Sequence, residues 1–203
     1  MSRASIYLSS QDLTSLVGLI PEGIRTVWCE NNKLTTLEGI PDSAEIIYCG
    51  NNNLTSLRGL PEGVQQLFCN ENFLTSLEGL PASLTDIHCV RNNLTTLKGL
   101  PEGVADIYCG GNQLTSLEGL PTGVQYVYCD NNELTSLKGL PEGTKFIDCG
   151  YNRLTSLEDL PTGIEYVSYI NNPIWWLHLA QDKIPEVELE TLGGLGIIFQ
   201  YLR

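Results

Sequence analysis

The chain has 203 residues, 42% of them hydrophobic, with 24 acidic and 11 basic side chains and a formal net charge of -13. Its length and hydrophobic content suit one domain with a continuous core. The negative charge disfavours nucleic acid and anionic membranes as partners, and it suits a partner protein with a basic surface. Because no apolar stretch reaches the length of a membrane span and no secretory signal is recognisable, we expect neither in this sequence.

A strict period of 20 residues runs through most of the chain. Seven cysteines recur at this interval from Cys29 to Cys149, and an asparagine stands three residues after each of them. The tetrapeptide Leu-Thr-Ser/Thr-Leu occurs eight times at almost the same spacing. Such a period indicates stacked repeats, in which each unit is one coil that buries its apolar side only against its neighbours.

The first predicted strand lies at residues 6–8 and aligns with residues 27–29 at an offset of 21. In a typical unit, residues 64–83, Leu67 and Cys69 point to the core face of a strand and Phe68 points to the opposite face. The leucines of the following tetrapeptide turn inward from the rest of the coil. The sequence therefore predicts about nine strands whose alternate side chains leave the core.

The asparagine after each strand is predicted to be buried at a bend, where its amide bonds to backbone groups of its own and the next coil. Prolines fix an extended outer side, because their φ is held near the polyproline value. Glycines after these prolines are predicted to permit the corner back into the strand. Ser43 and Ser83 replace two of them, so a positive φ is not obligatory there. These glycines are Gly23, Gly63, Gly103, Gly123, Gly143 and Gly163.

The unit pattern L-x-x-L-x-C-x-x-N-x-L-T-S-L-x-G-L-P-x-G resembles the leucine-rich repeat over roughly residues 6–177, with cysteine in one aliphatic place. The short, proline-marked form looks like the repeats of bacterial type III secreted effectors. The resemblance implies a β-rich solenoid, a leucine-rich-repeat horseshoe with a parallel concave sheet and an extended, polyproline-like convex side. It also makes delivery into a host cell by a non-classical secretion route conceivable.

The repeat ends near Leu177, and the remaining residues carry none of its features. We therefore predict a solenoid over residues 1–177 and a short C-terminal cap over residues 178–203. Pro185 is placed to open a short helix in this cap. Tyr169 takes the cysteine position in the last coil.

The seven cysteines favour neither a metal site nor disulfides. Their side chains run parallel in one column, and no Cys-x-x-Cys pair is present. We expect buried, free thiols, no metal and no cofactor, and a reducing, cytoplasmic setting. Buried thiols in apolar surroundings are inert, so a catalytic cysteine is not expected.

Function is expected on the strand face that points away from the core. Aromatic residues occupy the end of successive strands, and the aromatic run then shifts to the start of the last three. Asp86 and Asp106 are expected side by side, where a basic group of a partner can lie between them. Gly110 and Gly111 are expected to let that partner approach closely. The candidate partner-binding residues are Tyr7, Trp28, Tyr48, Phe68, Asp86, His88, Asp106, Tyr108, Tyr126, Tyr128, Phe146 and Tyr166.

Three interpretations of this face stay open. Contiguous aromatic residues mark interaction surfaces, so a monomer that binds another protein is the first. A carbohydrate that stacks on the aromatic residues is the second, and cross-strand stacking that only stabilises the sheet is the third. Catalysis is not expected: His88 and Asp86 can form an acid–base pair, but no activated nucleophile accompanies them.

Overall fold

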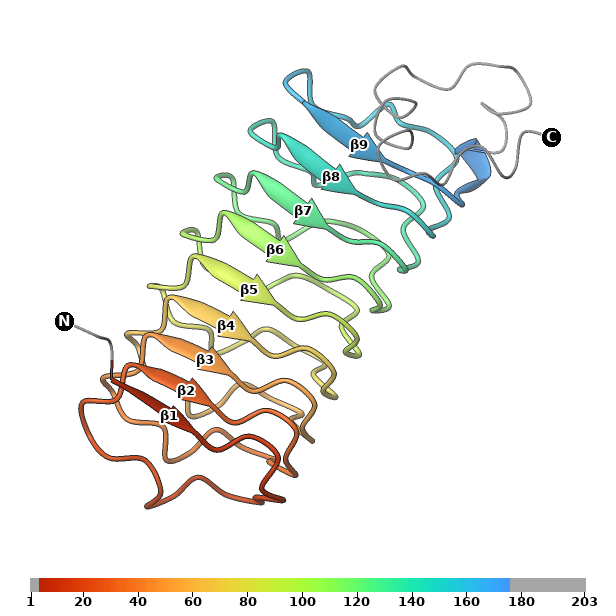
Figure 1. Cartoon of the computed structure of the whole chain (residues 1–203). Coiled ribbons are helices and arrows are strands. Elements are labelled where there is room, and N and C mark those ends of the chain that lie inside the picture. The colour runs from red at the N-terminus through yellow and green to blue at the C-terminus, as the bar shows by residue number, and fades with distance from the viewer. Residues whose placement is uncertain (1–3, 176–203) are drawn as a thin grey trace, which may run out of the picture.

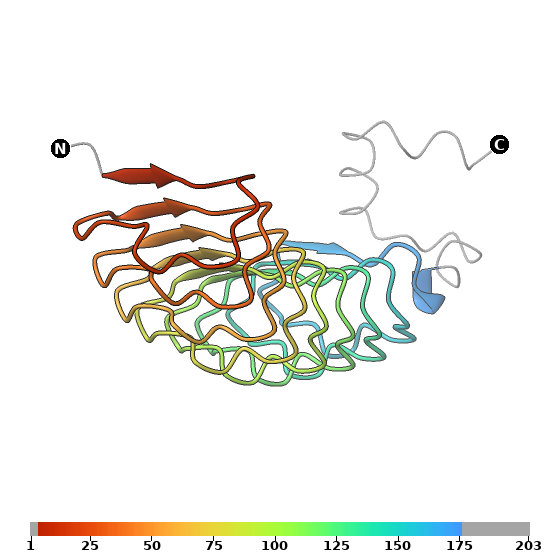
Figure 2. The ribbon, with the colours of Figure 1, turned by 90° about the horizontal axis from the view of Figure 1, so that it is seen from below.

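The computed structural model describes residues 4–175, and within this range nine three-residue strands form one parallel sheet in sequential order (Figure 1). Figure 2 shows the strands along the inner side of an arc and the connecting segments along its outer side. The predicted leucine-rich-repeat horseshoe with a concave parallel sheet is confirmed. The strands are β1 Ser5–Tyr7, β2 Thr26–Trp28, β3 Ile46–Tyr48, β4 Gln66–Phe68, β5 Asp86–His88, β6 Asp106–Tyr108, β7 Tyr126–Tyr128, β8 Phe146–Asp148 and β9 Tyr166–Ser168.

The sequence period sets the register of the sheet. From β2 onward each residue pairs with the residue 20 positions later, as Leu67 does with Ile87. The first pair has the predicted offset of 21, which places Ile6 opposite Val27. The segments that connect one strand to the next contain turns and no helix, which fits the short repeat length. Only residues 173–175, at the limit of the described chain, are helical.

The core is a stack of identical layers. The middle residue of each interior strand is almost completely buried, and so are the leucines of the repeated tetrapeptide except Leu13 and Leu157 in the end coils. All seven cysteines are buried and free, as predicted. Burial raises the pKa of the Cys29 and Cys89 thiols to about 12. The reactive thiolate is therefore suppressed, and the cysteine column acts as apolar packing.

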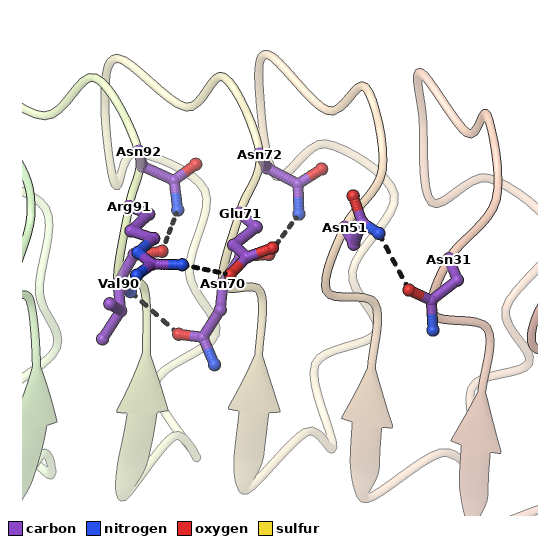
Figure 3. A network of polar contacts seen from close by, with 8 residues as sticks. All are labelled: Asn31, Asn51, Asn70, Glu71, Asn72, Val90, Arg91 and Asn92. Carbon is purple, nitrogen blue, oxygen red and sulfur yellow. Dashed lines mark hydrogen bonds and ion pairs between the residues drawn. The ribbon is translucent and has the colours of Figure 1, made fainter.

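A ladder of buried asparagines joins the coils. The Asn72 amide donates to the carbonyls of Cys69 and Cys49, each at 3.1 Å, and its Oδ1 accepts the backbone N–H of Leu54 at 2.9 Å. Besides its own coil, each asparagine therefore bonds to the preceding coil. The predicted bonds to the next coil were wrong. Figure 3 shows Asn72 and Asn92 directed back to the carbonyls of Asn70 and Val90 in their own coils.

The glycines that need a positive φ are different from those predicted. Among the predicted corner glycines, only Gly23 has a positive φ. Most of the glycines with a positive φ instead lie two residues before a proline, such as Gly119 with φ 103°. A Cβ on Gly119 would lie 2.8 Å from the backbone nitrogen of Lys98, because the chain passes close to the preceding coil there. The prediction missed this because it looked for glycine only at the return corner.

The C-terminal part of the described chain closes the last coil. Tyr169 is completely buried in the place that cysteine occupies elsewhere, and Trp175 packs against the core. The predicted cap at residues 178–203 and its helix from Pro185 lie outside the described residues. Within the described residues, no helix has the length and apolar character needed to cross a membrane.

Replacing Asn92 by alanine should lower the free energy of unfolding by about 2–4 kcal/mol, because buried carbonyls of two coils and one N–H lose their partner. Chemical denaturation followed by circular dichroism measures the change. Asn93→Ala is the matched control, because Asn93 is exposed and its side chain makes no hydrogen bond within the described structure. Equal stability of the two variants would contradict the ladder.

Replacing Gly119 by alanine should lower the free energy of unfolding by about 1–2 kcal/mol, because alanine disfavours the left-handed backbone. The close contact of its Cβ with the Lys98 backbone should lower it further. Gly123→Ala is the control, since its Cβ would meet only the Glu102 carbonyl at 3.9 Å. Thermal melting of both variants should show a clear loss only for Gly119→Ala. A larger loss for Gly123→Ala would favour the original corner prediction.

Candidate functional site

Two rows of side chains cover the concave face of the sheet. The first and last residues of the strands flank a middle residue that is buried in every interior strand. The strand pairing brings all twelve predicted residues onto this one face. The start row is Ser5, Thr26, Ile46, Gln66, Asp86, Asp106, Tyr126, Phe146 and Tyr166. The end row is Tyr7, Trp28, Tyr48, Phe68, His88, Tyr108, Tyr128, Asp148 and Ser168.

The rings of the end row stack on one another. Trp28 and Tyr48 lie 3.7 Å apart between ring centroids, with 4° between their planes. Tyr108 and Tyr128 are similar at 4.2 Å and 6°. Stacking covers the ring faces, so these side chains are half-buried and turn their edges outward. Tyr7 alone in this row is largely exposed, at 71%. The sequence predicted an exposed stripe; the structure presents a stripe of ring edges.

The aromatic stripe crosses from the end row to the start row at the seventh and eighth strands. The Phe146 ring lies 4.8 Å from Tyr128 and 4.4 Å from Tyr166, so it joins the two columns. Tyr126 is 6.3 Å from Phe146 and 41% exposed. The stripe therefore follows the end row from Tyr7 to Tyr128 and then shifts sideways to the start row, where it ends at Tyr166, as the sequence spacing predicted.

Two aspartates lie together beside the middle of the stripe. Asp86 and Asp106 are direct partners in neighbouring strands. The Asp86 Oδ1 atom lies 3.4 Å from His88 Nε2, but it is buried and has no hydrogen bond among the described residues. Burial and the charge of Asp86 raise the pKa of Asp106, and His88 offsets part of this rise. These two adjacent carboxylates have no lysine or arginine partner among the described residues.

A third carboxylate lies on the other side of the stripe. Asp148 follows Tyr128 in the end row and accepts the Gly150 N–H at 3.1 Å. Burial, more than the nearby charge of Asp130, raises the pKa of this carboxyl group. The sequence prediction left Asp148 out of the site. The available signal was an acidic residue at a position that is aromatic or imidazole in seven earlier coils.

No lysine or arginine occupies either row. The described ion pairs of these side chains join neighbouring coils elsewhere on the surface, with partners 20 or 21 residues apart. The concave face therefore combines aromatic edges with uncompensated negative charge. Those ion pairs are Arg25–Glu45, Lys33–Asp12, Arg91–Glu71, Lys138–Glu118, Lys145–Glu165 and Arg153–Glu133.

The predicted approach site at Gly110 and Gly111 is only partly open. The Asp130 side chain lies directly over Gly110, where a Cβ would otherwise stand. Beside Gly111, a shallow depression of about 510 Å³ extends along the rim past Arg91 and Glu71, whose ion pair is visible in Figure 3. The expectation of close approach over Gly110 was wrong, because the neighbouring coil fills the space.

The described residues include no group of three or more His, Cys, Asp or Glu side chains arranged to hold a metal ion. The Asp86–His88 pair has no cysteine, serine or lysine beside it in the two rows, and the cysteines lie on the core side of the sheet. The arrangement therefore offers recognition groups and no evident nucleophile.

No protein-family model and no curated protein matches the chain. Solved structures do match. YopM from Yersinia enterocolitica WA-314 is 28% identical, with a TM-score of 0.69 over 75% of this chain and 34% of that chain. The leucine-rich repeat domain of APL1B is 19% identical (TM-score 0.64, 82% and 51% covered), and a Shigella effector LRR domain is 22% identical (0.54, 87% and 74%). The fold is a leucine-rich-repeat solenoid.

The comparison with YopM and the 20-residue coil confirm the resemblance to the short repeats of bacterial effectors. The chain spans about a third of the length of YopM and about half of APL1B. These similarities establish the architecture. They do not by themselves assign a partner to the concave face.

Asp106→Asn should stabilise the protein at neutral pH. The folded state holds the Asp106 proton more tightly than the unfolded chain, so ionisation above the ordinary pKa of about 3.9 costs stability. The stability gain of Asp106→Asn over the wild type should therefore grow as the pH rises from the ordinary pKa to the raised one. It should vanish in acid, where Asp106 is protonated in both states. Denaturation midpoints measured across this range test it.

Asp12→Asn is the control of opposite sign, because the hydrogen bond from Lys33 lowers the Asp12 pKa. Asp12→Asn should lose stability at neutral pH, and the loss should disappear in acid. A destabilising Asp106→Asn at neutral pH would show that this carboxylate is well solvated or already paired.

Proposed function

We propose that this protein is a binding module for another protein, and that the partner lies along the concave aromatic stripe. The observation that carries the proposal is the continuity of the stripe over all nine strands, from Tyr7 to Tyr166. At the usual strand spacing it is about 40 Å long. Contiguous aromatic surface of this size is typical of interaction sites, and tyrosine is enriched among residues that dominate binding energy.

Stacking for stability alone explains less of this face. The sheet is already held by the leucine core and by the asparagine ladder, which span the same coils. Ring-to-ring contact adds about 0.5–1.5 kcal/mol per pair, so it has a stabilising role. It does not account for three carboxylates without a lysine or arginine on the same face. A partner that covers both features does.

The stacked geometry also favours protein over carbohydrate. A sugar ring stacks on an aromatic face, but the faces of Tyr48 and Tyr108 are covered by neighbouring rings on both sides. Nucleic acid is disfavoured by the net charge of -13. The TLR13–ssRNA13 complex also contains this fold, but at 15% identity (TM-score 0.61) the likeness concerns architecture alone.

We assign the protein no catalytic step, since the concave rows hold no activated nucleophile. Seven free, buried thiols suit a reducing compartment, where oxidation does not threaten the core. A cytoplasmic setting, in the cell that makes the protein or in a host cell, is therefore part of the proposal.

A photo-crosslinking amino acid tests the binding face. Placed at Tyr126, which is 41% exposed on the concave face, it should capture the partner from lysates of the producing organism or its host. Placed at Tyr151, 52% exposed on the rim, it should not. The captured protein is then purified, and Tyr108→Ala should weaken its binding by about 2 kcal/mol or more.

The proposal fails if the purified partner crosslinks from Tyr151 or the convex side and binds the Tyr108→Ala protein normally. Circular dichroism of each variant controls for folding. A glycan array probed with the same proteins covers the carbohydrate alternative, and binding that needs Tyr108 there would replace the proposal.

A further inference from the structure

Two of the concave carboxylates, Asp86 and Asp106, lie on one side of the aromatic stripe, and the third, Asp148, lies on the other. Asp86 and Asp106 belong to the start row, before the stripe crosses to that row at Tyr126. Asp148 belongs to the end row, after the stripe has left it at Tyr128. The sheet register fixes this diagonal arrangement, because each coil adds one strand without a shift.

The spacing between the two acidic positions follows from sheet geometry. Asp148 lies two strands from Asp106 and two residues further along its strand. With the usual strand and residue spacings, the Cα atoms of Asp106 and Asp148 are about 12 Å apart, and those of Asp86 and Asp148 about 16 Å. Both distances exceed the reach of a single side chain.

Neither position has a lysine or arginine of the described chain as its counter-charge, although Asp148 already accepts hydrogen bonds from the Gly150 N–H at 3.1 Å and from Ser168. Within residues 4–175, no lysine or arginine forms an ion pair with Asp86, Asp106 or Asp148. Asp86 has only the weak contacts of His88 at 3.4 Å and the Gln66 amide at 3.5 Å. All three side chains are already partly buried before any partner arrives.

We propose that the partner is held by two cationic side chains about 12–16 Å apart, one at Asp86 and Asp106 and one at Asp148, with an apolar ridge between them on the stripe. This inference rests on the proposed function and specifies the partner as a basic segment of a second protein. An arginine suits the first position, because its planar donor fork can serve two neighbouring carboxylates.

Desolvation makes the charge pattern selective. A partner that covers the concave face removes water from all three carboxylates. A neutral or acidic surface would leave them buried without a counter-charge, which is strongly unfavourable. A basic surface with the wrong spacing would satisfy one position only. The two positions together therefore select both the charge and the geometry of the bound segment.

Selection from a random peptide library tests this. Peptides are displayed that are long enough to span about 16 Å as an extended segment or as a helix. They are selected for binding to the whole wild-type protein. The selected peptides should share two basic positions with apolar residues between them. A separation of about 4 residues indicates an extended segment, and about 8 residues a helix.

Charge-swap variants then assign each basic position. Selection on Asp148→Lys should turn one of the two basic positions acidic and keep the other. In Asp106→Lys the new lysine stands beside Asp86 and neutralises it, so selection should lose the other basic position and keep the one at Asp148. Peptides chosen on the wild type should bind each variant at least about tenfold more weakly. Asp42→Lys is the matched control, because Asp42 is exposed outside the two rows and its change should leave the motif intact. Circular dichroism confirms folding of all variants.

The outcomes separate this inference from the proposed function. Selected peptides that need Tyr108 and Tyr126 but lack basic positions, or that ignore both charge swaps, overturn the two-cation arrangement and leave the concave interface standing. Peptides that bind equally well after alanine replacement of these tyrosines overturn both. If Asp42→Lys changes the basic motif as strongly as Asp148→Lys does, the motif responds only to the net charge of the protein. That result also overturns the inference.

Discussion

The hydrogen bonds of one buried asparagine per coil hold this architecture together. A coil of 20 residues has no room for a helix, so many of its backbone groups have no partner inside the coil. Each interior asparagine donates to carbonyls of its own coil and the preceding one, and it accepts an N–H from that preceding coil, as Asn112 does with Cys109, Cys89 and Leu94. The amide is suited to this because it combines two donors with an acceptor.

The regular stacking that follows from this ladder also shapes the concave face. Neighbouring strands lie at the usual spacing of about 4.8 Å, which is close to the distance at which aromatic rings stack. One aromatic residue per coil therefore becomes a continuous column, with centroid distances of 3.7 Å at Trp28–Tyr48 and 4.3 Å at Tyr48–Phe68. Rings fixed in this way lose little further freedom when a partner binds, so the surface is preorganised.

Repetition made most of the fold predictable from sequence. The period identified the coil, the cysteine column and the two rows, because every coil repeats one pattern of inward and outward side chains. Details that depend on contact between coils were not predictable in this way. The direction of the asparagine bonds, the positive φ of Gly119 and the Asp130 side chain over Gly110 all arise from how one coil lies against the next.

The placement of the candidate residues was predicted in outline for the same reason. Alternation along the strand placed the twelve candidate residues on one face, but it gave no information on stacking, which covers the ring faces and leaves the edges. Asp148 was missed because the search followed aromatic residues, and its significance appears only when its position across the stripe from Asp86 and Asp106 is known.

Hydroxyl-radical footprinting of the complex with a purified partner tests the central claim most directly, since it reports the solvent exposure of individual aromatic side chains. The account predicts that Tyr7, Tyr126 and the ring edges between them lose reactivity on binding, while the exposed Phe73 and Tyr151 stay reactive. Protection of Phe73 or Tyr151 with unchanged reactivity along the stripe would contradict it.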